Sequence, residues 1–271
     1  MLVAVRRLLI VGFLIALTAC GGSGSTRTGG DDAAINDPDT PQPLLGTTVS
    51  PAPMSSAITG VTYPIHIYLP PGYAESDATY PVIYATDGQW DFDRYARIID
   101  KAGKNIVLVA IEQGPEGRRG VDYLLPGARD FFLFLTSELL PRVEADYRIN
   151  TEQRTLAGGS YGGVFVGAAM LLDDVVAPTF NNYFAFDPSF WQHPELTEQL
   201  EQSRYHASQE LAVNLLLTSA TIVGNDHYVT QMFNYLVQRD YSGLTITRRS
   251  YNVTHEDINA PSFRDAVATF F

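Results

Sequence analysis

A serine between two glycines is the strongest chemical signal in this chain of 271 residues. Gly158, Ser160 and Gly162 fit the pattern G-x-S-x-G. Residues 154–157 before them have the composition of a strand, and an apolar helical stretch begins at Tyr161. This strand–turn–helix setting is what a nucleophile elbow requires, because the glycines permit a turn so tight that the serine hydroxyl projects from the sheet. The pattern predicts that Ser160 is a nucleophile, and a structural Gly-Ser turn is the alternative.

A serine hydroxyl needs a base before it can attack, and the chain has five histidines. His255 follows the last predicted strand and precedes the last predicted helix, which is where hydrolases with this elbow carry their base. The other four histidines lie on an early strand or beside predicted helices, where a structural or solvated role is the simpler interpretation. They are His66, His193, His206 and His227. We therefore expect His255 to be the base.

A carboxylate should hold the imidazole and stabilise its protonated form. The chain order of serine, acid and histidine leaves two candidates. Asp226 follows the predicted strand 211–217 in the loop before a helix, which is the commonest place, so we favour it. Asp187 at the end of the preceding strand is the alternative, and a Ser–His pair without an acid stays open.

The oxyanion formed during acyl transfer needs two backbone N–H donors. The first should be Tyr161, the residue after the nucleophile, and the second should come from the loop after an early strand. The strand 81–85 is followed by Asp87 and Gly88, where glycine would allow a close turn. We therefore expect the N–H of Gln89 to be the second donor.

The elements that must position these residues alternate between strands and helices. Residues 61–69 alternate apolar and polar side chains, as in a half-buried antiparallel strand. Near-continuous apolar runs, typical of parallel strands covered on both faces, lie at 81–85, 106–111, 183–186 and 211–217. Stretches with the residue spacing of helices lie between or after these runs, at 91–101, 130–147 (with a kink at Pro141), 161–172, 194–202, 228–239 and 261–270. This order predicts one α/β domain over residues 46–271, a three-layer sandwich with a mostly parallel central sheet.

Composition excludes several classes of protein. Hydrophobic residues make up 45% and charged residues 18%, which is unlike a disordered chain. The formal net charge of −12 argues against nucleic acid as a partner, because phosphate binding needs basic patches. A single cysteine permits neither an intramolecular disulfide nor a cysteine-based zinc cluster, and we expect neither metal nor cofactor.

The first 20 residues have the pattern of a targeting signal. Arg6 and Arg7 precede the apolar run 8–17, which is short for a membrane span, and Cys20 stands where a secretory signal would be cut. This arrangement resembles the lipobox of bacterial lipoproteins, in which the cysteine is lipidated. The resemblance implies an envelope protein anchored at Cys20, and Gly21 implies outer-membrane sorting in a host that has such a membrane.

Residues 21–45 are rich in Gly, Ser, Asp and Pro and lack an apolar period, so we interpret them as a flexible linker. Loss of residues 1–20 would change the net charge from −12 to −14, because they contain two arginines and no acidic residue. A charge of this sign opposes adhesion to anionic lipid, so acyl chains would have to provide the anchor.

Over most of residues 60–270 the chain resembles the serine esterases of the α/β-hydrolase fold, in particular the esterase D-like, or putative-esterase, group. The resemblance rests on YPVIYATDGQ at 80–89, ELLP at 138–141, the elbow, DPSFW at 187–191 and the loop of His255. That group includes siderophore esterases, feruloyl esterases and mycolyltransferases. The siderophore-esterase branch is the most similar, although it tends to have a serine where this chain has Asp187.

The resemblance implies a serine carboxylic-ester hydrolase that acts through an acyl-enzyme on a small ester, of siderophore or aromatic type. It implies a substrate contact for Arg119, and Trp90 and Trp191 follow elements that converge on the site, although core packing would explain both tryptophans equally well. Two alternatives remain open from the residues. One is an acyltransferase on the same fold, and the other is a non-catalytic binding lipoprotein. Neither the ester nor the oligomeric state follows from the sequence.

Overall fold

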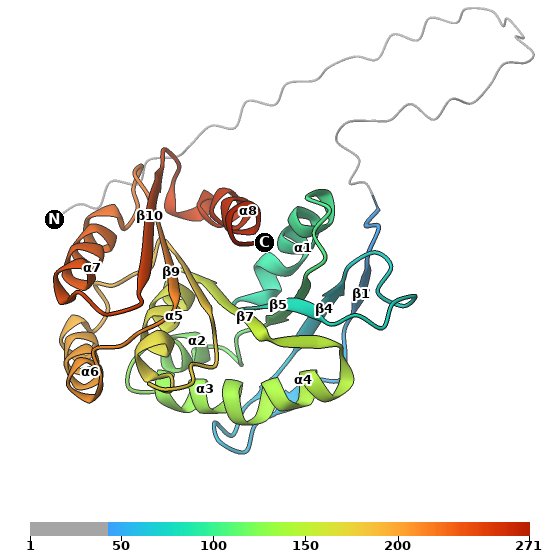
Figure 1. The fold of residues 1–271 in the computed structure, drawn as a ribbon, viewed down its shortest axis with the longest axis horizontal. Helices are drawn as coiled ribbons and strands as arrows, with labels where there is room; N and C mark the ends of the chain where they lie inside the picture. Colours follow the sequence, from blue (N-terminus) through green and yellow to red (C-terminus); the bar gives the residue numbers. More distant parts are fainter. Residues whose placement is uncertain (1–42) are drawn as a thin grey trace, which may run out of the picture. The chain divides into compact units, whose positions relative to one another are not determined.

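Eight strands form the central sheet in a computed structural model that describes residues 43–271. Across the sheet their order is β1-β4-β6-β5-β7-β8-β9-β10 (Figure 1). Their bounds are Thr47–Val49 (β1), Ile65–Leu69 (β4), Tyr80–Ala85 (β5), Val107–Ile111 (β6), Ile149–Gly159 (β7), Asn182–Phe186 (β8), Asn214–Ala220 (β9) and Thr245–Tyr251 (β10). The predicted signal with Cys20, and the predicted linker up to residue 42, lie outside the described residues.

The strands from β6 to β10 in this order run parallel to one another, whereas β4 runs antiparallel to both β6 and β1. All residues of β6 are buried, and β8 and β9 are buried except at their first residues. Such strands must be covered on both faces, as their continuous apolar runs predicted. A separate two-stranded sheet joins Met54–Ser55 (β2) to Thr62–Tyr63 (β3).

Helices cover both faces of the sheet, which confirms the predicted three-layer sandwich. One face is covered by α1 (Gly88–Lys101) and α8 (Asn259–Phe270), which lie side by side in Figure 1. The other face carries the remaining helices: α2 (Arg118–Asp122), α3 (Ala128–Phe134), α4 (Leu140–Asp146), α5 (Tyr161–Leu172), α6 (Pro194–Ala207) and α7 (Asp226–Arg239).

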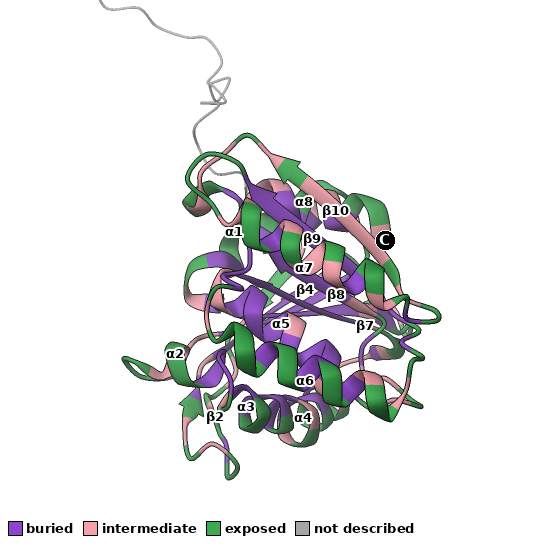
Figure 2. Cartoon of the chain, turned by 90° about the vertical axis from the view of Figure 1, so that its left-hand side faces the viewer, coloured by how far each residue is buried: buried purple, intermediate pink, exposed green. Residues whose placement is uncertain are grey.

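Two apolar cores lie on the two sides of the sheet, because successive side chains of a strand point to opposite faces. In β5, Val82 and Tyr84 belong to the larger core under α3 to α7, while Ile83 and Ala85 belong to the smaller core under α1 and α8. Figure 2 shows the inner strands as buried, the edge strand β10 as intermediate to exposed, and the outer helix surfaces as exposed. The helix α5 after the elbow is buried on nearly every side, as its all-round apolar sequence requires.

Three local differences from the predicted elements have physical causes. Pro64 separates β3 from β4, so the single strand expected over residues 61–69 is interrupted. The expected kink near Pro141 is a π-helical turn, Leu135–Leu139, between α3 and α4. Proline has no N–H to donate to the preceding turn, and in α4 it occupies the first turn, where no such bond is needed. The short helix α2 was not predicted.

The folded domain makes its first described contacts at the end of the predicted linker. Leu44 packs against the smaller core, and the backbone N–H groups of Leu45 and Gly46 donate to the carboxylate of Asp100.

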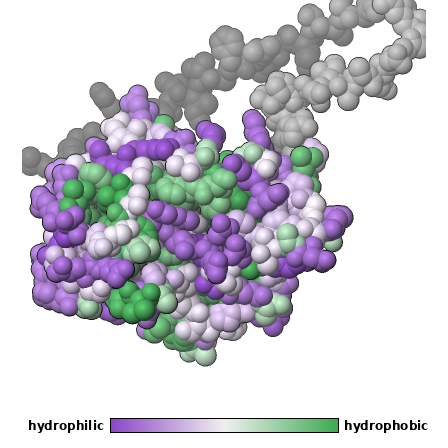
Figure 3. Space-filling model, viewed as in Figure 1, coloured by the Kyte–Doolittle hydropathy of each residue, from purple (hydrophilic) through white to green (hydrophobic). Residues whose placement is uncertain are grey.

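On the face drawn in Figure 3, hydrophilic residues predominate and hydrophobic ones form separate patches. Among the described residues, none of the helices has the length and apolar character needed to cross a bilayer.

Replacement of Phe263 by alanine should destabilise the layer that carries the His255 loop. Phe263 is fully buried on α8 and stacks on Tyr95 of α1 with ring centroids 3.8 Å apart. We expect Phe263→Ala to lower the free energy of unfolding by about 3–5 kcal/mol, because it leaves a cavity between two helices. Leu133→Ala, on an exposed face of α3, should change it by at most about 0.5 kcal/mol. Urea denaturation of both variants measures the difference, and equal effects would contradict it.

Candidate active site

Ser160 stands in a strained turn between β7 and α5. Its backbone has φ 55° and ψ −118°, values that a non-glycine residue adopts only when its surroundings impose them. Those surroundings are visible as hydrogen bonds. The N–H of Ser160 donates to the carbonyl of Phe186 at 2.9 Å, and its carbonyl accepts from the N–H of Ser189 at 3.2 Å. The neighbouring strand β8 and the segment after it therefore hold the elbow open.

The two glycines of the elbow are needed for close approach. A Cβ at either Gly158 or Gly162 would collide with the hydroxyl of Thr86, the residue that follows β5. Gly163 likewise lies against Pro188, where a Cβ would come within 3.0 Å. The G-x-S-x-G pattern thus brings the turn into contact with the ends of β5 and β8, where other candidate residues lie.

His255 and Asp187 form the strongest polar pair near this turn. Nδ1 of His255 lies 2.6 Å from Oδ2 of Asp187, a carboxylate that is fully buried. Asp187 is the first residue after β8 and has a positive φ of 41°, so the chain turns sharply there. His255 begins a short 3-10 helix, His255–Asp257, directly before α8, which is the predicted loop position.

Backbone N–H groups fix the Asp187 carboxylate in place. Oδ1 accepts from the N–H of Ala220 at 2.9 Å and from the N–H of Asn225 at 3.0 Å. The side-chain amide of Asn225 also donates to the backbone carbonyl of Asp187 at 2.8 Å. The end of β9 and the loop before α7 therefore surround Asp187 with donors, and Oδ2, which also accepts from the N–H of Asn225 at 3.1 Å, faces the histidine.

Asp226, the preferred acid in the sequence-based prediction, does not hold His255, and that assignment is wrong. It begins α7, and its carboxylate accepts from Ser219 at 2.5 Å and from Arg248 at 2.6 Å. The pKa of Asp226 is lowered, chiefly because the Ser219 hydroxyl donates to it. Asp226 thus belongs to a polar cluster between β9, β10 and α7. The alternative, Asp187, occupies the position beside the imidazole.

Ser160 and His255 line the same cavity, which has a volume of about 600 Å³. The hydroxyl of Ser160 lies 3.3 Å from that of Ser189, and the imidazole side chain is about one-third exposed. The predicted residues Trp90 and Arg119 also line this cavity. The rest of the wall is polar and comes from β7 and from α1, α8 and the segments before them: Asp87, Asp91, Arg94, Gly159, Glu256 and Asn259.

Arg119 is held by the protein itself at the edge of this cavity. Its Nε and Nη2 atoms each lie 2.8 Å from an oxygen of Asp87, and Nη2 is also 3.4 Å from the carbonyl of Gly159. Its guanidinium lies over the rings of Trp90 and Tyr161. Burial raises the pKa of Asp87, and the hydrogen bonds from Arg119 oppose that effect. Arg119 therefore ties the turn after β5 to the elbow after β7.

The two predicted oxyanion donors lie in the first turns of helices. Gln89 is the second residue of α1 and Tyr161 is the first residue of α5, positions where N–H groups have no partner within their own helix. In the turn after β5, where glycine was expected to allow a close turn, the positive φ belongs to Asp87 and not to Gly88. Gly88 instead permits close packing, because a Cβ there would lie 3.0 Å from the backbone of Ala110 in β6.

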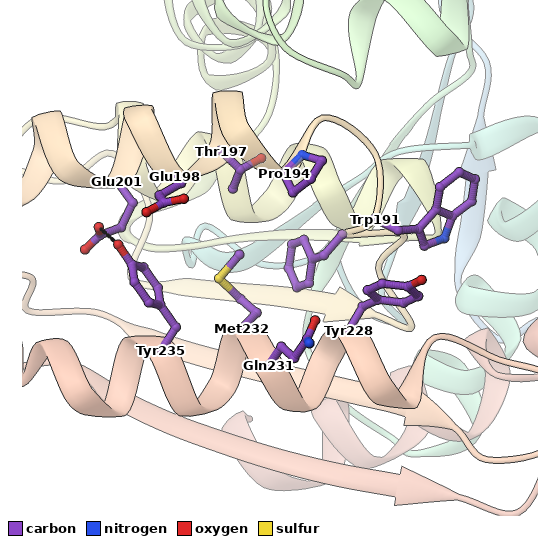
Figure 4. A pocket seen from close by; sticks show the side chains of 10 residues that line it. Trp191, Pro194, Thr197, Glu198, Glu201, Tyr228, Gln231, Met232 and Tyr235 are labelled. Atoms are coloured by element: carbon purple, nitrogen blue, oxygen red, sulfur yellow. Dashed lines mark hydrogen bonds between the residues drawn. The ribbon is translucent and has the colours of Figure 1, made fainter.

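Trp191 lies beside a second cavity, of about 500 Å³, between α6 and α7 (Figure 4). Its indole N–H donates to the side-chain carbonyl of Asn225 at 3.0 Å. Sequence reasoning missed Asn225 and Ser189. Ser189 lies within the DPSFW segment but received no role of its own, and Asn225 is a common cap residue outside any motif; only the fold shows that they lie next to Ser160 and Asp187.

Comparison with known proteins agrees with this architecture. A family model described as "Putative esterase" matches residues 56–210, more than half of the chain. The ferri-bacillibactin esterase BesA of Bacillus subtilis is 27% identical over 124 residues, which are 45% of this chain and 40% of that protein. The matched part is thus well under two thirds of the relative's length.

Two solved structures share the fold. An IroE-like serine hydrolase from Shewanella oneidensis superposes with a TM-score of 0.70 at 24% identity, covering 83% of this chain and 80% of the other. The siderophore hydrolase EstB from Aspergillus nidulans superposes with a TM-score of 0.67 at 18% identity, covering 83% of this chain and 95% of the other. The chain therefore has the three-layer fold of these hydrolases.

The choice between the two carboxylates can be tested without any substrate. A proton shared by the His255 imidazole and a buried carboxylate should give a far-downfield proton resonance in NMR spectra. We expect this resonance in the wild type and in Asp226→Asn, and its loss in Asp187→Asn, because only Asp187 lies beside Nδ1. Asp226→Asn serves as the matched control on the neighbouring loop. Loss of the resonance in Asp226→Asn alone would overturn the geometry.

Proposed function

The chain belongs to the putative esterase family, and from this membership and the geometry of its site we propose that it is a serine ester hydrolase. The observation that carries the proposal is the spatial arrangement of three side chains, with His255 between Ser160 and Asp187. The first two line one cavity, and the third is buried behind the imidazole at 2.6 Å. Family membership alone would not assign these roles, and the geometry supplies them.

In the proposed reaction Ser160 is the nucleophile and His255 the base. Nε2 of His255 takes the hydroxyl proton as the Ser160 oxygen attacks the ester carbonyl, and the same proton then leaves with the alcohol. Water, deprotonated by His255, attacks the resulting acyl-enzyme, and His255 returns that proton to the Ser160 oxygen as the bond to the acid breaks. Asp187 orients the imidazole and stabilises its charged form, a role for which its fixed, fully buried carboxylate is suited.

The negative oxygen of the tetrahedral intermediate would bind to the N–H groups of Tyr161 and Gln89. A donor of this kind contributes about 3–4 kcal/mol to stabilisation of the transition state. Arg119 contacts both elements that carry these donors, through Asp87 on one side and the Gly159 carbonyl on the other. We propose that Arg119 holds this geometry and also faces the substrate cavity. This adds a positioning role to its predicted contact with the substrate.

The names of the similar proteins favour a siderophore-type ester as substrate. The curated relative is a ferri-bacillibactin esterase and one structural neighbour is a siderophore hydrolase. The cavity carries Arg94 and Arg119 among carboxylates. It therefore offers charges of both signs to a polar substrate, even though the whole chain is acidic.

We also propose that the protein is anchored in the cell envelope through lipid on Cys20. The motif LTAC at 17–20, with its basic and apolar flanks, supports this proposal. The residues between Cys20 and the first strand would act as a tether that lets the catalytic domain stand clear of the membrane surface.

Covalent labelling tests the nucleophile. A fluorophosphonate reacts only with an activated serine, so we expect labelling and ester cleavage in the wild type and loss of both in Ser160→Ala, with activity reduced at least about 10³-fold. Ser189→Ala is the matched control, because Ser189 is the buried hydroxyl 3.3 Å away, and its labelling should persist. Labelling that survives Ser160→Ala and disappears in Ser189→Ala would refute the assignment.

Mass spectrometry of the envelope fraction tests the anchor. We expect the mature protein to begin at Cys20, with a mass increase from acyl chains, and to partition into detergent. Cys20→Ser should lack the mass increase from acyl chains, because the lipidated atom is the cysteine sulfur. An unmodified Cys20 in the native host would contradict the proposal.

A further inference from the structure

The groove between α6 and α7 is the second cavity at the catalytic edge of the sheet. Figure 4 shows side chains of the two helices facing each other across it, with Trp191 and Tyr228 at one end and Glu201 and Tyr235 at the other. The buried Phe190 also lines it. The remaining lining residues are Pro194, Thr197, Glu198, Gln231 and Met232.

Topology places one end of this groove beside the catalytic residues. Helix α6 follows β8 and α7 follows β9, so both helices begin at the carboxyl edge of the parallel sheet. Ser160, Asp187 and His255 lie at that same edge, since they follow β7, β8 and β10. The groove then extends away from the edge by about 10 Å, the length of the seven helical residues between Tyr228 and Tyr235.

Hydrogen bonds connect the mouth of the groove to the proposed catalytic acid. Trp191 donates to Asn225 at 3.0 Å, and Asn225 donates from its backbone to Asp187. The amide of Asn225 also lies 3.3 Å from the hydroxyl of Ser189, which is itself 3.3 Å from the hydroxyl of Ser160. The indole at the mouth is thus held in a fixed position a few side chains from the nucleophile.

The surface of the groove suits an uncharged apolar group. Trp191 is 46% exposed and Tyr228 is 40% exposed, so two aromatic side chains face solvent where a ligand could cover them. Glu201 at the far end is already paired, with Arg239 at 2.8 Å and Tyr241 at 3.0 Å. Its carboxylate would repel an anion and is not free to bind a cation.

We propose that this groove binds the uncharged aryl or alkyl arm of the ester that is cleaved at Ser160. This inference rests on the proposed function. The cavity that holds Ser160 and His255 is lined mainly by charged and polar side chains, whereas aromatic and other apolar side chains predominate in the groove, so a substrate with a polar and an apolar side would place each in the better-matched cavity. The groove therefore determines which esters react well and takes no part in the bond-breaking step.

Substitution at Gln231 tests this subsite with little risk to folding, because Gln231 is an exposed residue of α7 that lines the groove. Gln231→Trp should fill the groove and Gln231→Ala should leave it open. Val237→Trp adds the same indole on the exposed opposite face of α7. The substrates are p-nitrophenyl acetate and hexanoate, which vary the acid, and methyl and benzyl acetate, which vary the size of the alcohol with little change in its acidity.

In the wild type we expect kcat/KM to rise with the larger apolar group in one of the two ester pairs. Gln231→Trp should reduce that preference at least about 10-fold, the effect of excluding one or more methylene-sized groups from an apolar pocket. In the pair that responds, the rate on the ester with the smaller group should stay close to wild type, as should all rates of Gln231→Ala and Val237→Trp. Unchanged preferences of Gln231→Trp in both pairs would overturn the inference.

A binding measurement gives an independent test that uses no groove-filling variant. The chain has two tryptophans, so Trp90→Phe leaves Trp191 as the only indole. Phenylboronic acid, which can form an adduct with the active serine, should change the emission of Trp191, whereas methylboronic acid should not. Equal responses would contradict the subsite. A wild type that is neither labelled by fluorophosphonate nor active on any ester would instead refute the proposed function.

Discussion

The hydrogen bond between His255 and Asp187 is the contact on which the arrangement of the site depends. It joins the loop after the last strand to the end of β8, across the intervening strand β9. A fully buried carboxylate is tolerated there only because backbone N–H groups of Ala220 and Asn225 also donate to it. The parallel sheet provides these partners, since it brings the ends of β8, β9 and β10 to one edge.

Strain at three turns along this edge has the same origin. Asp87, Ser160 and Asp187 follow β5, β7 and β8, and each has a positive φ although none is glycine. Such conformations cost free energy and persist where surrounding contacts impose them. The conformations differ, since ψ is 36° at Asp87 and −118° at Ser160. What the elbow, the acid and the carboxylate that holds Arg119 share is a sharp change of chain direction directly after a strand of the parallel sheet.

The sequence was sufficient to predict the sandwich and the elbow, because both depend on local signals, and chain order was sufficient to predict that His255 lies on the loop before the last helix. Apolar runs identify buried strands, and glycines mark the turn around Ser160. The carboxylate was different, because Asp187 and Asp226 both follow strands in the allowed order. What separates them is the curvature of the backbone at Asp187 and the partners Ser219 and Arg248 that engage Asp226. Neither is encoded in a short motif, and the same is true of Asn225.

The way in which Asp187 is held has a consequence for how this protein can diverge. Its carboxylate is bound by main-chain N–H groups at both ends of the segment 220–225, so the identity of most side chains between them matters little to the contact. Loop length and the tight packing of Gly224 against Ala220 are the constraints. The side chains of Thr221 and Ile222 can therefore change while the acid stays in place, provided that no residue is inserted or lost, whereas the positive φ of 52° at Val223 restricts the residue type there.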